Sequence, residues 1–294
     1  MSVLLMTVWL TGCVQEELGS TPSPTGNGIR FTLTVPDVNL PSVSSRTMTG
    51  TGTAKKEDEI ETVDILVFDM SKTPAVYLEC VSATGVTQDL ADNSTVSFSA
   101  VLSPTTASTC IVVVANKELD NIVSGFMKGT TTKVEAMEKM LHAQTGKWLA
   151  DGSTTDGYTR IPMYGEKVIS KITPSMDPIT GINMKRMLAR IDIRNNSATS
   201  NFTVEEVYLA NYNTTGYIAP PWNTNGQVTD PAPDTPVLPV NSGKMTEEGD
   251  AILYSVNGNT PYDGEIYTFE SLAAEDAGGV GQDGEASRKD ATCL

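Results

Sequence analysis

Apolar and polar residues alternate along several short stretches of the chain, and the first stretch begins at residue 29. Its apolar residues are Ile29, Phe31, Leu33 and Val35, with polar residues between them. A period of two places these four side chains on one face of a β-strand. Residues 63–69 (VDILVFD) follow another pattern, an almost continuous apolar run rich in β-branched residues. This run is typical of a strand that is buried on both faces.

The rest of the chain predicts more short strands and few helices. The further strands expected from these patterns are 75–81, 95–102, 110–115, 168–173, 184–194, 202–211, 251–256 and 265–270. Two short helices are expected at 117–127 and 132–144, the second because Val134, Met137 and Leu141 recur at helical spacing. Many short strands with frequent turns predict a mainly β protein of two sandwich-like domains in series.

Turn-forming residues divide the chain and suggest where these domains lie. The 294 residues exceed one typical core, and Pro and Gly residues near residue 181 predict a boundary between domains at 47–181 and 182–294. Residues 36–56 and 213–243 read as long exposed loops, the first containing Arg46. The last four residues resemble the start of a strand, so the second domain is expected to be incomplete.

The N-terminal residues predict export and lipid attachment. Residues 2–12 form an apolar run that is too short to span a bilayer and is typical of a signal-peptide core, so residues 1–12 are interpreted as a signal peptide. Leu10-Thr11-Gly12-Cys13 resembles the bacterial lipobox, in which the cysteine is acylated, and residues 13–27 would form the lipidated tether. The alternative is a buried N-terminal helix with an incidental cysteine, and the run lacks a preceding Lys or Arg.

Charge excludes one class of partner, and the cysteines leave one question open. A net charge of −16 with a pI near 4.4 excludes nucleic-acid binding, which requires a basic surface. Cys80 and Cys110 lie in expected strands, either as buried free thiols or as a mutual disulfide. Cys293 is the remaining cysteine if Cys13 carries lipid.

No pattern of residues predicts catalysis or a cofactor. The single histidine, His142, is expected on the exposed face of a helix without metal-ligating neighbours. Pairs of carboxylates are numerous and are interpreted as solvated surface. Trp222, Tyr212 and Tyr217 could stack on sugar rings, or could pack their loop onto its own sheet.

Five features occur in an order that resembles a known family. They are the lipobox, Ser45-Arg46-Thr47 after an early strand, residues 58–69 (DEIETVDILVFD), residues 185–193 (KRMLARIDI) and residues 266–270 (IYTFE). With this order and spacing the chain resembles the FimA-type major fimbrillin family of the Bacteroidales, the type V pilins. The resemblance implies two tandem Greek-key, transthyretin-like β-sandwiches with a few short helices.

The resemblance also implies a route of assembly. Family members reach the outer membrane as lipoproteins, here through lipid on Cys13, and an arginine-specific protease cuts after the loop arginine, here Arg46, which leaves Thr47 as the first residue. The cut would release residues 28–46, the first strand and the cleavage loop. The exposed edges then accept a strand from another fimbrial subunit, which in the family comes from the C-terminal end. The fibre supports adhesion or biofilm formation.

The sequence also leaves open a second function, glycan binding at the cell surface. A surface-anchored lipoprotein that binds glycans through the loop containing Trp222 would carry the same signal peptide and tether. It would keep Cys13 permanently, whereas a fimbrial subunit would lose it with the first strand.

Overall fold

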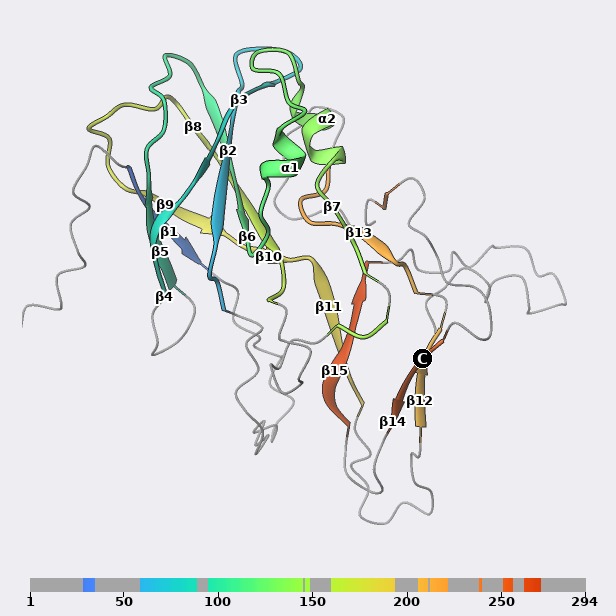
Figure 1. Ribbon diagram of the computed structural model, residues 1–294. Helices are drawn as coiled ribbons and strands as arrows, with labels where there is room; N and C mark the ends of the chain where they lie inside the picture. The colour runs from blue at the N-terminus through green and yellow to red at the C-terminus, as the bar shows by residue number, and fades with distance from the viewer. Residues whose placement is uncertain are drawn as a thin grey trace, which may run out of the picture.

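Strands dominate the part of the chain that the structure describes. The computed structural model describes residues 29–34, 59–88, 95–144, 146–148, 160–193, 206–210, 212–221, 238–239, 251–255 and 262–270. Within these residues the helices are short, α1 (Asp120–Val123) and α2 (Lys133–Glu138) (Figure 1). The expectation of a mainly β protein with sandwich-like layers is confirmed.

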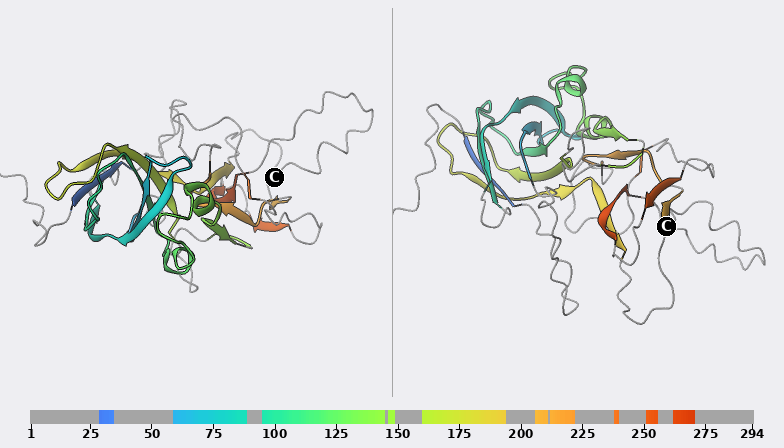
Figure 2. Two further views of the ribbon diagram at one scale, coloured as in Figure 1. Left: turned by 90° about the horizontal axis from the view of Figure 1, so that it is seen from above. Right: turned by 60° about the horizontal axis from the view of Figure 1, so that its bottom comes forward.

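Two facing sheets form the N-terminal sandwich. The first sheet has the order β4-β5-β1-β9, with β1 (Ile29–Thr34), β4 (Thr84–Gln88), β5 (Thr95–Ala100) and β9 (Ile179–Asn183). The second has the order β10-β8-β6-β2-β3, with β2 (Val63–Asp69), β3 (Val76–Ser82), β6 (Thr109–Ala115), β8 (Met163–Ile169) and β10 (Lys185–Arg186). Seen from above, the sheets curve toward each other into an almost closed ring (Figure 2).

Strand β2 is buried on both faces, as its sequence predicts. Ile65 and Val67 point into the core between the two sheets, and Leu66 and Phe68 point into a second core on the opposite side. The alternation follows from the pleat, which sends successive side chains to opposite faces. The second core includes residues of the region that contains α1 and α2.

The two sheets are connected at both sides by chain that passes directly from one sheet to the other. Ala83 separates β3 from β4, and Met184 separates β9 from β10. Strands that switch sheets make such corners in orthogonally packed sandwiches. At the second corner β8 and β9 approach so closely that there is no room for a side chain at Gly165. A Cβ atom there would lie 2.7 Å from the carbonyl oxygen of Asn183.

The remaining strands form three pairs beside the N-terminal sandwich (Figure 1). The pairs are β11 (Leu188–Ile193) with β15 (Tyr262–Phe269), β12 (Glu206–Leu209) with β14 (Ile252–Ser255), and β7 (Leu141–Ala143) with β13 (Thr215–Tyr217). The β7–β13 pair joins the two halves of the sequence. The core that contains Phe68 also contains Ile218 and Phe269, so one apolar cluster spans both halves.

Several expected elements need correction. The helix expected at 132–144 ends at Glu138, and residues 141–143 form β7 instead, because they pair with β13. The helix expected at 117–127 is limited to α1. Strands β4 and β9 lie where no strand was expected, and β13 lies within the expected loop at 213–243. The strand expected at 168–173 is β8, which begins at Met163 and ends at Ile169.

Candidate functional site

Strand β1 lies inside its sheet and is paired along both edges. It runs antiparallel to β5, with Ile29 opposite Ala100 and Thr34 opposite Thr95, and parallel to β9, with Phe31 opposite Ile179. An inner strand therefore comes from a segment that precedes every other described element in the sequence. We call β1, together with the residues of β5 and β9 that contact it, the β1 site.

The apolar face of β1 is a central part of the core between the sheets. Ile29, Phe31 and Leu33 are 4%, 1% and 0% exposed. Burying each such side chain contributes about 1.5–3 kcal/mol. The ring of Phe31 stacks on that of Phe98 in β5, with centroids 5.0 Å apart and planes 8° apart. The segment is thus well bound, and its loss would open the core.

Strand β9 depends on β1 for its sheet contacts. It is the outer strand of its sheet, so in the described structure β1 is its neighbour in the ladder. The corner residue Met184 also donates its backbone N–H to the carbonyl oxygen of Thr34, at 2.9 Å. Ile179 and Ile182 are buried in the core. Without β1, β5 would keep its pairing with β4 but lose its partner on the other edge, and β9 would lose its ladder partner, while both strands would keep their buried apolar side chains beside the gap.

Ion pairs and hydrogen bonds fix the chain just before β2, at Glu59 and Glu61. Arg160 forms ion pairs with Glu59 at 3.2 Å and with Glu61 at 2.5 Å. The side-chain amide of Asn116 donates to the carbonyl oxygens of Glu59 at 2.8 Å and of Ile161 at 3.0 Å. The start of β2 therefore has anchors of its own, which are independent of β1.

The predicted site residues divide into two groups. Ile29, Phe31 and Leu33 lie together at the β1 site, as the alternation predicts. Cys13, Val35, Arg46 and Thr47 lie outside the described residues, and the roles assigned to them stay predictions.

The walls of the β1 site were not identified from the sequence as functional residues. The burial of Phe98 could have been predicted from the sequence, because apolar and polar residues alternate in β5 as they do in β1. Ile179 and Ile182 carry no comparable local signal, since Gly181 between them has a φ of +71° and β9 pairs in parallel with a strand far away in sequence.

Cys80 and Cys110, the two cysteines among the described residues, are free thiols. Cys80 lies on β3 and Cys110 on β6, the two strands that flank β2, and neither forms a disulfide. Burial raises the pKa of Cys80 to about 12 and also raises that of Cys110. This outcome agrees with the reading of both residues as inert thiols, although Cys80 is only partly buried.

His142 does not lie on an exposed helix face. It is on β7, partly buried, with its ring 5.2 Å from that of Trp148 and 6.4 Å from that of Phe269. Burial lowers its pKa, and the charge of Lys117 lowers it further. Among the described residues there is no group of three or more His, Cys, Asp or Glu side chains that could hold a metal ion.

Two of the three aromatic residues that could stack on sugar rings are described, and neither is fully exposed. Tyr212 is buried at 5% exposure, and Tyr217 is partly buried on β13. Trp222 lies outside the described residues. Among the helices of the described structure, none has the length and apolar character needed to cross a bilayer.

Comparison with known proteins gives one family. The family model described as major fimbrial subunit protein (FimA) matches residues 29–181, more than half of the chain. The match begins at the first residue of β1. No curated protein matches the chain.

Two solved structures from Parabacteroides distasonis are similar to the chain. A fimbrial assembly protein is 12% identical, with 84% of this chain and 79% of the other covered and a TM-score of 0.41. A candidate cell adhesion protein is 16% identical, with 85% and 73% covered and a TM-score of 0.46.

Proposed function

The chain belongs to the family of major fimbrial subunit proteins (FimA), and we propose that it is a surface fimbrial subunit that polymerises by strand exchange once β1 has been removed by proteolysis. The family is one of fimbrial structural subunits and not of enzymes, which supports a role in a surface fimbria together with other fimbrial subunits. The order of cleavage, strand loss and strand acceptance is the part that we propose.

The observation that carries the proposal is the position of β1. It is an inner strand with three almost fully buried side chains, although residues 35–58 connect it to the rest of the domain. Removing an inner strand exposes unpaired N–H and C=O groups on both neighbours, together with an apolar groove between them. A strand from a second subunit can fill that groove by β-augmentation.

Covalent connection explains why uncleaved subunits would remain monomeric. While residues 35–58 are intact, β1 rebinds its own domain intramolecularly and outcompetes a strand that must arrive from solution. A cut after Arg46 makes this rebinding bimolecular, so the released segment can be displaced. Glu59 and Glu61 remain anchored by Arg160 after the cut, so β2 keeps its place.

The same cut would release the membrane anchor. In this proposal residues 1–12 direct export, lipid on Cys13 holds the precursor at the outer membrane, and an arginine-specific protease separates residues 13–46 from the domain at 47–181. The incoming strand would place three alternating apolar side chains in the positions of Ile29, Phe31 and Leu33. Its central side chain would contact Phe98, as Phe31 does.

The test is cleavage of the purified full chain with an arginine-specific protease. We expect N-terminal sequencing to give Thr47, and unheated gels to show a ladder of polymers. Arg46→Ala should prevent both, whereas Arg30→Ala, an exposed residue of β1, should behave as the wild type.

A peptide with the sequence of residues 28–35 gives a second readout. Added in excess to freshly cleaved subunits, it should fill the groove and stop the ladder from growing, and a peptide with Phe31→Asp should not. The proposal is wrong if cleaved chains never form polymers, or if Arg46→Ala forms them equally well.

A further inference from the structure

Strand β9 contains one residue more than the part of β1 with which it pairs. Phe31 stands opposite Ile179 and Leu33 stands opposite Ile182, so two steps along β1 correspond to three steps along β9. The extra residue makes a β-bulge at residues 180–181, which we call the β9 bulge. Bulges are rare between parallel strands, so this one is a specific feature of the β1 site.

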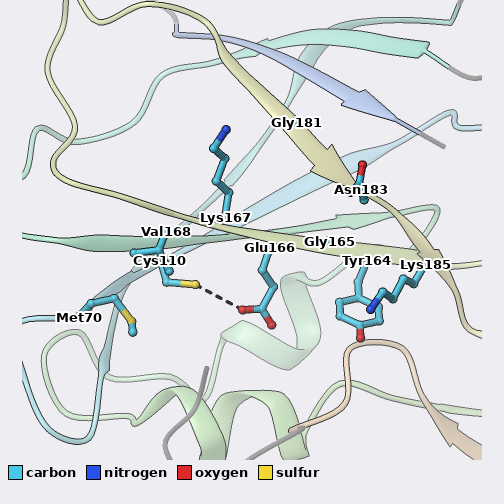
Figure 3. Close-up of a pocket in the computed structure, with 10 residues that line it drawn as sticks. All are labelled: Met70, Cys110, Tyr164, Gly165, Glu166, Lys167, Val168, Gly181, Asn183 and Lys185. Atoms are coloured by element: carbon cyan, nitrogen blue, oxygen red, sulfur yellow. Dashed lines mark hydrogen bonds between the residues drawn. The ribbon is translucent and has the colours of Figure 1, made fainter. Parts of the chain in front are cut away.

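Two interactions of different kinds hold the β9 bulge. Gly181 has a φ of +71°, a backbone conformation that glycine adopts readily and that other L-residues adopt at a cost. The extra residue of a bulge is left out of the ladder, and here the Lys167 ammonium donates to the carbonyl oxygen of Thr180. Figure 3 shows the Lys167 side chain pointing from β8 toward β9, on the opposite side of β8 from Glu166. A neighbouring strand therefore supports the bulge.

The bulge allows two isoleucines to reach the same core. In a regular strand, residues three positions apart point to opposite faces. Ile179 and Ile182 are three positions apart, yet both are buried in the core that contains Phe31 and Leu33. The β9 wall thus offers two apolar contacts to side chains that are only two residues apart on the strand in the β1 site.

The β5 wall alone cannot set the register of that strand. Ala100, Phe98 and Val96 face the core at a regular spacing of two, each opposite one apolar residue of β1. A strand displaced by two residues would keep its apolar face in the core and its pattern of hydrogen bonds to β5, because side chains repeat every two residues. The same displacement would bring a different residue opposite the β9 bulge and break the match with β9. The β9 wall therefore distinguishes registers that β5 does not.

We propose that the β9 bulge fixes the register of the strand that occupies the β1 site, and thereby determines which segment of a second fimbrial subunit is accepted. This inference rests on the proposed strand exchange. The accepted strand runs antiparallel to β5 and parallel to β9, as β1 does. It carries apolar side chains at the positions of Phe31 and Leu33, with the residue between them opposite the bulge. Every subunit of the fibre is then joined at the same offset.

Disulfide crosslinking in the full chain measures the register. Thr32→Cys is combined in turn with Ser97→Cys, Ser99→Cys and Thr95→Cys, none of which alters a residue of the core cluster. Ser97 stands opposite Thr32, and the other two positions report displacements by two residues in either direction. Thr32→Cys alone gives the background. We expect the chain with an intact bulge to crosslink mainly to Ser97→Cys.

Deletion of Gly181 removes the bulge and keeps the apolar pattern. It leaves Ile179, Thr180 and Ile182 in regular alternation, so both isoleucines still face the core. Crosslinking to Ser99→Cys and Thr95→Cys should rise about fivefold or more, because even a small register preference has an effect of this size when it is lost.

A second bulge in the same sheet provides the matched control. Strand β4 has one extra residue relative to β5, and its Gly85 has a φ of +63°. Strand β5 separates β4 from β1. Deletion of Gly85 also turns a bulge into a regular strand, but it should leave Ser97→Cys as the main crosslinking position.

A point variant covers the case in which the chain without Gly181 fails to fold, as judged by circular dichroism. Gly181→Ala then decides, because the nearest atom to the added Cβ is Nζ of Lys167 at 3.6 Å, so the change acts through the backbone conformation. It should shift the crosslinks in the same direction. The proposal is overturned if the folded variant crosslinks as the wild type does, or if deletion of Gly85 has the same effect.

A peptide separates this inference from the proposed function. The sequence of residues 28–35 with Thr32→Cys, added to cleaved subunits, should also crosslink mainly to Ser97→Cys, and deletion of Gly181 should remove this preference. If polymer ladders form but deletion of Gly181 leaves the crosslinks unchanged, strand exchange stands and the role of the bulge is wrong. If the deletion shifts the crosslinks in the full chain but cleaved subunits accept neither peptide nor partner, strand exchange is wrong, and with it the selection of a partner strand.

Discussion

Phe31 and Phe98 form the stacked pair at the centre of the N-terminal core, with ring centroids 5.0 Å apart. The two residues stand directly opposite each other in the β1–β5 ladder, so one backbone register sets both the pairing and the stacking. Their proposed fates differ. Phe31 belongs to the segment that would leave the subunit, whereas Phe98 belongs to β5, which would remain. Mutations of the two residues can therefore separate the stability of the uncleaved chain from the stability of the fibre.

Phe31→Ala should destabilise the uncleaved chain strongly. Phe31 is 1% exposed and makes the aromatic contact described above, and truncation of such a residue costs about 3–5 kcal/mol. Urea denaturation of the uncleaved chain measures the loss. Arg30→Ala, on the exposed face of the same strand, should change the unfolding free energy by no more than about 0.5 kcal/mol. Equal effects of the two variants would contradict the assignment of β1 to the core.

In assembled fibres the two phenylalanines should have different effects. If β1 has been replaced by a strand from another subunit, Phe31→Ala is absent from the mature protein and fibre stability should equal that of the wild type. Phe98→Ala should lower the temperature at which the polymer ladder dissociates, because its ring lines the groove in every subunit. A matching loss with Phe31→Ala would mean that β1 remains in the fibre.

Gly165→Ala should destabilise the fold by closing the space between β8 and β9. The added Cβ would lie 2.7 Å from the carbonyl oxygen of Asn183 and 2.8 Å from Cγ2 of Ile182, and a backbone atom cannot move aside cheaply. We expect a loss of about 1–3 kcal/mol, the usual range for overpacking. Gly125→Ala is the control, because its Cβ would meet only an atom 4.0 Å away. Thermal unfolding of the two variants gives the comparison.

The parts of the fold that were predicted correctly are those with a strong local pattern. The alternation at Ile29, Phe31 and Leu33 and the apolar run at 63–69 each determine a strand and the faces that it buries. Helix α2 also begins where its sequence indicates, since Thr132 and Glu135 form a capping box.

The parts that were missed depend on distant partners. The helical spacing of Val134, Met137 and Leu141 extends past the end of α2, but residues 141–143 gain a ladder with residues 215–217, which local spacing does not reveal. Beside the β7–β13 pair, Gly216 packs against the ring of Phe269, a contact between strands that are far apart in sequence. The walls of the β1 site escape detection for the same reason, because β9 acquires its role only by pairing with β1.

Both described cysteines should resist alkylation in the folded chain. Burial raises the pKa of Cys80 to about 12, so very little thiolate is present at pH 8, and Cys110 is buried as well. Iodoacetamide followed by peptide mass spectrometry should show slow labelling of both residues in buffer and rapid labelling in urea. Rapid labelling of Cys80 in buffer would contradict the environment described for it.

The stability of the fold should fall as the solution is acidified toward pH 5, and His142 should account for part of this fall. Its partly buried ring packs between Trp148 and Phe269, and its buried Nδ1 atom has no hydrogen-bond partner, so protonation there is unfavourable. Burial, reinforced by Lys117, lowers its pKa below the ordinary value of 6.5, and a hydrogen bond with Gln144 opposes this only in part.

The sign of the effect follows from proton binding. Between the lowered pKa of the folded state and 6.5, the unfolded chain binds more protons at this position, so stability rises with pH and is lost as pH falls through 6.5. The slope from this one group is at most about 1.4 kcal/mol per pH unit. The chain has a single histidine, so the difference between the wild type and His142→Phe isolates its contribution from that of the carboxylates. Urea denaturation from pH 7.5 to 5.5 should give a flatter dependence for His142→Phe, and identical slopes would show that His142 titrates normally in the fold.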